Sequence, residues 1–196
     1  MNQKNLLEVD WSKIPAPTDD GAAAHLEGMT IPPVSLIATD DTSVRLSALP
    51  GRTVVFAYPR TGEPGKISIV DDWDMIPGAR GCTPQTCAFR DLFAELKAAG
   101  SSHVFGLSTQ SNAYQAEMAA RLHLPFPVLS DEKLTLTSAL DLPTMEVAGL
   151  ILIKRLALII DNGRITHVFY PVFPPDRKCR RRAGMAEGES GLSWVG

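Results

Sequence analysis

Apolar and polar positions alternate along this chain in a pattern that predicts strands and helices in turn. Residues 34–38 and 44–46 are short apolar segments separated by the polar run TDDTS, which predicts a hairpin. Residues 53–58, TVVFAY, are β-branched and aromatic with almost no polar interruption. Such a run is typical of a strand buried on both faces of a sheet, so we expect a central strand here.

The clearest helical pattern follows Pro84. Apolar residues recur there at helical spacing, Pro84 suits a first turn and Gly100 suits a C-terminal stop; the repeating residues are Phe89, Leu92, Phe93 and Leu96. Between the central strand and this helix, residues 59–81 are rich in Pro and Gly and predict a long loop with one short element. Loops of this length inside a compact domain are usually functional or disordered.

The rest of the chain continues the alternation. We expect a strand at 103–109, a helix near 111–122, a strand at 126–130 and a short helix near 131–140. Two apolar runs, 155–160 and 165–170, flank Asp161-Asn162-Gly163, and an Asn-Gly pair favours a tight hairpin turn. Two antiparallel strands should therefore complete the sheet.

These elements predict an α/β fold of the thioredoxin-like kind, with a central mixed sheet flanked by helices and an N-terminal hairpin. Residues 1–30 lack sustained periodicity and are expected to form a leader that is extended or wraps over the domain. The domain itself should span residues 31–175. Residues 176–196 are expected to form a basic, flexible tail without an amphipathic repeat.

Composition narrows the class of protein. The 196 residues are 44% hydrophobic and 21% charged with a formal net charge of −3, as in an ordinary soluble domain without a general attraction to nucleic acid. The basic run around Cys179 lacks interleaved aromatic residues. The most apolar stretch, 147–160, is too short to span a bilayer and contains Lys154 and Arg155. No secretory signal begins the sequence, so we expect a cytoplasmic protein that binds neither membrane nor nucleic acid.

Two of the three cysteines lie at the start of the strongest predicted helix. Unpaired amides and the helix dipole at that position stabilise a thiolate, and we expect a lowered thiol pKa for Cys82. A thiolate can attack a peroxide to give a sulfenic acid, and a nearby second thiol, Cys87, can condense with it to form a disulfide. Five positions in an intact helix mean about 7.5 Å of rise and a rotation of roughly 140°. That disulfide therefore requires local unwinding.

The cysteine pair has other interpretations. Two structural thiols at a helix start are the plain alternative. A metal site is disfavoured because no second cysteine pair or close histidine completes a ligand set. A nucleotide cofactor is disfavoured because no phosphate-binding or dinucleotide fingerprint follows a strand. We therefore expect no metal and no cofactor.

The segment GCTPQTCAFRD at 81–91 resembles the GCTxExCxFRD segment of Q-type peroxiredoxins, also called bacterioferritin comigratory proteins. VVFAYP at 54–59 and KRLALIIDNGRI at 154–165 resemble two strands of that family, and the similarity covers about residues 28–175. The resemblance implies a thioredoxin-dependent peroxidase acting on hydrogen peroxide or organic hydroperoxides. In it Cys82 would be peroxidatic, Cys87 resolving, Arg155 the active-site arginine, and Pro59 would shield the thiolate. Without it, Arg155 would be interpreted as a solvated charge.

The chain departs from the family's P-x-x-x-T-x-x-C signature. Pro59 matches the proline, but about sixteen additional residues precede Cys82, and Ala79 stands where the threonine is expected. We hypothesise that the inserted loop folds back so that Thr61 or Thr83 donates the hydroxyl, and that Arg80 supplies positive charge. Gln85 on the helix is a further supporting residue, although polar helix residues are usually just a wet face.

Two other functions remain open at this point. A lost signature threonine and an unusual tail would suit a non-enzymatic redox sensor or a degenerate thioredoxin-fold module. A thiol-disulfide oxidoreductase acting on proteins is the third alternative, but such enzymes typically use C-x-x-C rather than this C-x-x-x-x-C spacing. The expected partners are a peroxide substrate and thioredoxin or a similar dithiol reductant, and the chain is expected to be a monomer or a homodimer.

Overall fold

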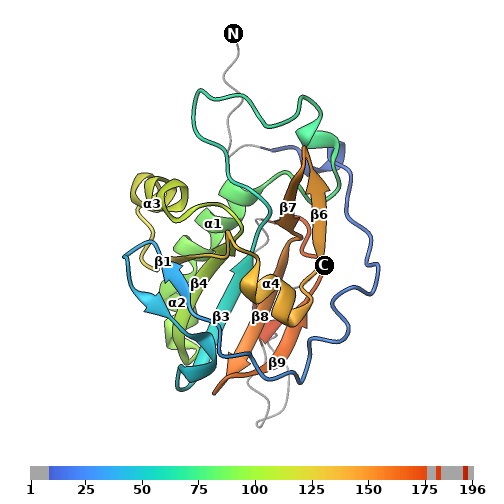
Figure 1. The fold of residues 1–196 in the computed structure, drawn as a ribbon. Helices are drawn as coiled ribbons and strands as arrows, with labels where there is room; N and C mark the ends of the chain where they lie inside the picture. The colour runs from blue at the N-terminus through green and yellow to red at the C-terminus, as the bar shows by residue number, and fades with distance from the viewer. Residues whose placement is uncertain (1–8, 176–179, 182–191, 194–196) are drawn as a thin grey trace.

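A mixed sheet of seven strands forms the centre of the computed structural model, which describes residues 9–175, 180–181 and 192–193. The strand order is β2-β1-β5-β4-β3-β8-β9 (Figure 1). β3, β4 and β5 are parallel, and the other neighbours pair antiparallel. The strands are β1 (Leu36–Ala38), β2 (Ser43–Val44), β3 (Arg52–Ala57), β4 (Ser101–Ser108), β5 (Val128–Ser130), β8 (Leu156–Asp161) and β9 (Arg164–Phe169). This confirms the predicted α/β fold with its N-terminal and C-terminal hairpins.

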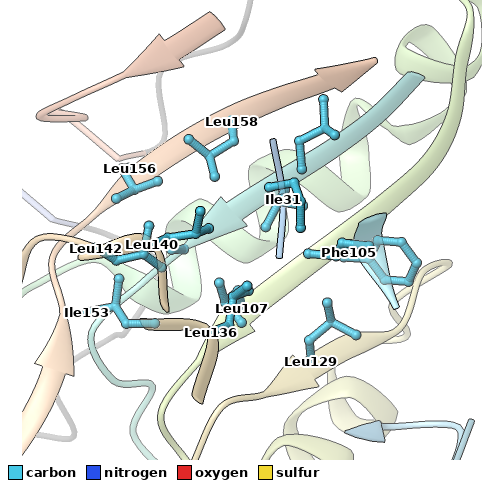
Figure 2. Close-up of a cluster of buried hydrophobic side chains, with 14 of the residues drawn as sticks. Ile31, Phe105, Leu107, Leu129, Leu136, Leu140, Leu142, Ile153, Leu156 and Leu158 are labelled. Atoms are coloured by element: carbon cyan, nitrogen blue, oxygen red, sulfur yellow. The ribbon is translucent and has the colours of Figure 1, made fainter. Parts of the chain in front are cut away.

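Helices cover both faces of the sheet. α1 (Cys82–Asp91), α2 (Phe93–Ala98) and α3 (Asn112–Arg121) bury apolar side chains against one face. α4 (Thr135–Leu140) packs on the other face, together with the segment that precedes β1 (Figure 1). Figure 2 shows this second cluster, in which Ile31 and Leu136 meet leucines from the strands.

The central strand β3 illustrates why its sequence is uniformly apolar. Val55 and Ala57 point into the cluster of Figure 2, whereas Val54 and Phe56 join the cluster under α1–α3. Phe56 stacks on Phe89 of α1 with ring centroids 4.0 Å apart. Successive side chains of a strand point to opposite faces, so a strand covered on both sides needs apolar residues at every position.

The long helix predicted after Pro84 is divided. α1 ends at Asp91 and α2 begins at Phe93, with Leu92 between them at φ −89° and ψ −2°. The hydrogen-bond path continues through the break, because Leu92 N–H donates to Ala88 and Leu96 N–H donates to Leu92. Leu92 and Leu96 are both buried, so the predicted apolar face is retained across two short helices.

The leader packs on the domain. Ala23 and Leu26 are buried in the core, and Thr30 forms an isolated antiparallel bridge with Arg164 of β9. Further upstream, a 3-10 turn covers Trp11–Lys13. Within the tail, the structure describes only β10 (Arg180–Arg181) and β11 (Leu192–Ser193), which pair antiparallel. Cys179 and the predicted flexibility of the tail lie outside the described residues.

A second hairpin, β6 (Thr144–Val147) and β7 (Leu150–Ile153), was not predicted. Ala148 and Gly149 form its turn, both with positive φ (51° and 75°), as in the tight turns that suit a two-residue hairpin. An Ala at the first turn position hides this signal, because Asn or Gly usually stands there.

Within the described part of the chain, no helix is long and apolar enough to cross a membrane.

Candidate active site

The topology brings three chain segments to one edge of the sheet. β3 ends at Ala57 and leads into Tyr58 and Pro59, while the antiparallel neighbour β8 begins at Leu156, which pairs with Ala57. Arg155 therefore lies beside the carboxyl end of β3. The parallel neighbour β4 ends at the same edge, where the Ser108 hydroxyl donates to the carbonyl of Pro59 at 3.2 Å. The first residue of α1, Cys82, faces this edge.

The Cys82 sulfur is buried, with the residue only 2% exposed, and is surrounded by hydrogen-bonding groups. The Arg155 Nη2 group donates to Sγ at 3.3 Å, and the backbone N–H of Arg60 donates at 3.4 Å. In its protonated form the thiol can donate to the carbonyl of Ala79 at 3.5 Å. Two donors, one of them charged, favour a thiolate at the N-terminus of a helix.

Arg155 is buried, which differs from the solvated charge that its sequence position alone favoured. Besides the sulfur, its Nη2 group donates to the carbonyls of Gly78, Ala79 and Arg80 at 3.1–3.4 Å. A buried guanidinium costs little only when its donors are satisfied. The end of the inserted loop thus supplies the acceptors that hold Arg155 against Cys82.

Gln85 lies one helical turn after Cys82 and accepts a hydrogen bond from Nη1 of Arg155 through Oε1. It is fully buried, so it does not belong to a wet face of α1. Nε2 of Gln85 and Nε of Arg155 are buried without a hydrogen-bond partner among the described residues. Buried donors of this kind are unusual, and one of them belongs to the guanidinium that contacts the Cys82 sulfur.

The two threonines considered for the signature hydroxyl differ in position. Thr61 is buried at the edge of the site, but its hydroxyl donates to Oε1 of Gln110 at 3.1 Å. Thr83 is buried in the first turn of α1. In the described part of the chain, the hydrogen bonds include none from either hydroxyl to the Cys82 sulfur.

Arg80 contributes its backbone to the site more directly than its side chain. Its carbonyl accepts from Arg155, whereas its guanidinium pairs with Asp74 at 3.3 Å. Pro59 is buried at the end of β3, immediately before the amide that reaches Cys82. The structure therefore brings Pro59, Thr61, Arg80, Cys82, Thr83, Gln85 and Arg155 into one region.

Cys87 lies on the same helix as Cys82, and both are free thiols in an unbroken α1. Cys87 packs in the apolar cluster that contains Phe56 and Phe89. Burial raises the pKa of the Cys87 thiol, although nearby Arg90 opposes this effect. At five positions' separation in a helix, the two sulfurs need backbone movement to bond.

The inserted loop, residues 60–81, packs on the unpredicted hairpin. Trp73 and Ala79 form a small apolar cluster with Val147 of β6 and Leu152 of β7. The loop contains one short 3-10 turn, Trp73–Met75, as its sequence predicted. The loop is thus a built part of the site that carries the carbonyls around Arg155.

Gly81 closes this loop as the N-cap of α1, with φ at 104°. A Cβ at this position would collide with Pro175 and with Trp11, whose Cη2 lies 2.6 Å from it. Trp11 also packs edge-on against Phe173, with ring centroids 5.9 Å apart. Segments from both ends of the domain therefore cover the N-terminus of α1, and only glycine fits beneath them.

Sequence reasoning missed Arg60, Gln110 and Tyr114. The Arg60 guanidinium lies 5.1 Å from the ring centre of Tyr114, and the Tyr114 hydroxyl donates to the carbonyl of Thr61 at 3.0 Å. One signal was present, because the carboxyl ends of adjacent parallel strands meet at one edge and Gln110 directly follows β4. No group of three or more metal-ligating side chains is found among the described residues.

A thioredoxin-like sheet that presents an arginine-paired thiol at the first turn of a helix defines a class of thiol-based redox proteins. The family model described as Redoxin matches residues 26–183. The chain therefore belongs to the redoxin family and, within it, to the peroxiredoxins.

Individual relatives agree with this assignment. The chain is 30% identical to the chloroplastic peroxiredoxin Q of Sedum lineare over 152 residues, which are 77% of this chain and 72% of the relative. It is 29% identical to the chloroplastic peroxiredoxin Q of Oryza sativa subsp. japonica, of which it spans 62%. Among solved structures, it resembles the peroxidoxin BcpB of Mycobacterium tuberculosis with a TM-score of 0.59 at 27% identity, covering 76% of this chain and 88% of the other.

Proposed function

We propose that this protein is a thiol-dependent peroxidase in which Cys82 reduces hydrogen peroxide or an organic hydroperoxide. The observation that carries the proposal is the pair of donors on the Cys82 sulfur, from Arg155 at 3.3 Å and from the Arg60 amide at 3.4 Å. These groups favour the thiolate, and the same donors can stabilise negative charge that develops on a peroxide oxygen. Nε of Arg155 and Nε2 of Gln85, on two buried side chains that are hydrogen-bonded to each other, have no partner among the described residues.

The first chemical step forms an S–O bond and breaks the O–O bond. The Cys82 thiolate attacks one peroxide oxygen, and the other oxygen leaves as hydroxide or alkoxide and takes a proton to become water or an alcohol. Cys82 is thereby oxidised to a sulfenic acid. Arg155 stays cationic throughout and faces the oxygen on which charge develops.

The second step joins the two cysteines. The Cys87 sulfur attacks the sulfenic sulfur, an S–S bond forms, and the sulfenic oxygen leaves as water. α1 must unwind near its first turns for this, because both cysteines lie in an intact helix. An external dithiol such as thioredoxin then reduces the disulfide by thiol exchange.

Rapid mixing of the fully reduced protein with an equivalent of hydrogen peroxide tests the proposal. We expect fast loss of peroxide and formation of a Cys82–Cys87 disulfide. Rapid quenching and peptide mass spectrometry detect the disulfide. Cys82→Ser should abolish both events, since it removes the attacking sulfur. Slow peroxide loss in the parent, or oxidation that persists in Cys82→Ser, would instead favour a redox sensor without peroxidase activity.

Condensation of the two cysteines should accelerate as the pH rises. Burial raises the pKa of Cys87 in the closed helix, so the unwound state releases the proton more readily. Because the unwound state then binds fewer protons than the closed one, rising pH favours unwinding and also supplies the attacking thiolate. The measurement is the single-turnover rate of disulfide formation from about pH 6 to about pH 9, below and around the ordinary thiol pKa. A rate independent of pH would contradict this account of Cys87.

A further inference from the structure

The segment that follows Pro59 is held by the side chain of Gln110. Oε1 of Gln110 accepts from the Thr61 amide at 2.8 Å and from the Thr61 hydroxyl at 3.1 Å. Nε2 of Gln110 donates to the carbonyl of Thr61 at 3.2 Å. A single amide group thus binds both backbone polar groups of one residue, as a neighbouring strand would.

Gln110 is itself fixed in place. It is 4% exposed, its N–H donates to the Ser108 hydroxyl, and its carbonyl accepts from Nε2 of Gln115 at 2.9 Å and from the Ser130 hydroxyl at 2.8 Å. The same Ser108 hydroxyl donates to the Pro59 carbonyl. Buried polar networks that are this well satisfied are rigid, so the positions of Pro59 and Thr61 follow from the ends of β4 and β5.

Arg60 lies between these two anchored residues, and its N–H points at the Cys82 sulfur at 3.4 Å. The donor that the family pattern would supply, a threonine hydroxyl, is absent at Ala79, and the Thr61 hydroxyl is already used by Gln110. The backbone amide of Arg60 and the Arg155 guanidinium are the two donors that the described residues give to this sulfur.

We infer that the Arg60 amide takes the place of the signature hydroxyl in holding the Cys82 thiolate, and that Gln110 is the positioning residue that aims this amide. The inference deepens the proposed peroxidase function and rests on it for its consequence in catalysis. Gln110 does not touch the sulfur. It acts by fixing the backbone of Thr61, the residue that follows Arg60, and thereby the direction of the Arg60 N–H.

The test compares variants in a background in which Cys82 is the sole thiol, Cys87→Ser with Cys179→Ser. The readout is the rate of Cys82 alkylation by iodoacetamide at neutral pH, which needs no peroxidase activity. Gln110→Leu keeps the approximate volume and removes all three bonds to Thr61. Because the Arg60 amide then holds the thiolate less well, we expect alkylation of Cys82 to slow by roughly tenfold.

A matched control separates positioning from general loss of stability. Leu140 of α4 is buried in the cluster on the opposite face of the sheet, so Leu140→Ala should lower the melting temperature without slowing the alkylation of Cys82. If Gln110→Leu lowers the melting temperature and leaves the rate of Cys82 alkylation unchanged, the inference is overturned. It is overturned equally if Thr61→Val slows this alkylation more than Gln110→Leu does, because the hydroxyl would then be the donor.

A measurement on the unmodified protein decides the matter even if Gln110→Leu does not fold. The nuclear magnetic resonance signal of the Arg60 amide proton should differ between the reduced protein and Cys82→Ser, because the sulfur that accepts from this amide is then lost. An Arg60 amide signal that is the same in both proteins would refute the inference. A signal that differs as expected, in a protein that does not consume peroxide, would leave the positioning intact and reject the proposed function alone.

Discussion

Replacing Arg155 with methionine is expected to slow the reaction of Cys82 with hydrogen peroxide by roughly 100- to 1,000-fold, the loss typical of removing a preorganised charged donor. Arg155 donates to the sulfur and also gathers three loop carbonyls around itself. The substitution therefore removes the positive charge that stabilises the thiolate and the leaving oxygen. It also leaves those carbonyls without their donor. The measurement is the second-order rate of peroxide consumption by stopped flow at neutral pH.

Arg52→Met is the matched control for this prediction. Arg52 begins β3 at the end of the strand opposite to Pro59, and it pairs with Asp161 at 2.9 Å in a partly exposed ion pair. The same substitution there removes one positive charge without touching the site, and a partly exposed pair contributes little to stability. We expect the peroxide rate of Arg52→Met to equal that of the parent. Equal rates in Arg155→Met and the parent would show that Arg155 has no part in the chemistry.

Replacing Cys87 with serine is expected to abolish repeated turnover with a dithiol reductant while preserving the first reaction with peroxide. Cys87 lies in the apolar cluster under α1, and the two donors to the Cys82 sulfur come from Arg60 and Arg155 instead. Without a resolving thiol, Cys82 should remain as a sulfenic acid and then oxidise further in excess peroxide. Mass spectrometry of the quenched protein, together with a thioredoxin-coupled assay, measures both results.

The contrasting variants make this prediction specific. Cys82→Ser should lose the first reaction as well as turnover. Turnover that continues undiminished in Cys87→Ser would show that the reductant acts directly on the Cys82 sulfenic acid, and the disulfide would then have no role in the cycle. Because Cys179 is a third thiol, the Cys179→Ser background is needed for each comparison.

Local patterns predicted most of the fold. The uniformly apolar TVVFAY run became β3, and the Asn162-Gly163 pair became the turn between β8 and β9, with φ of 49° and 79°. Both signals are local, because side-chain alternation and turn chemistry act over a few residues. The β6–β7 hairpin was missed for the same reason, since Ala148 is an atypical residue for its turn position.

In the candidate site, too, local features were predicted from the sequence and long-range contacts were not. The cysteine pair and its helix were readable from the GCTPQTC segment, because the helix start, the thiols and their spacing are all local features. The burial of Arg155 was not, since the carbonyls that satisfy it come from Gly78–Arg80, about seventy-five positions away in the chain. The same holds for Gln110, which reaches Thr61 across 49 positions.

The sequence by itself therefore determined most of the order of strands and helices, the thioredoxin-like architecture and the thiol pair at the start of α1. Only the tertiary structure decided which groups donate to Cys82, because the inserted loop removes the signature threonine and no local rule says what replaces it. That loop packs on Val147 and Leu152, which places its carbonyls around Arg155. The pairing of β3 with β4 places the Arg60 amide next to the sulfur. Long-range packing determines such contacts, and the local pattern of polar and apolar residues along the chain does not predict them.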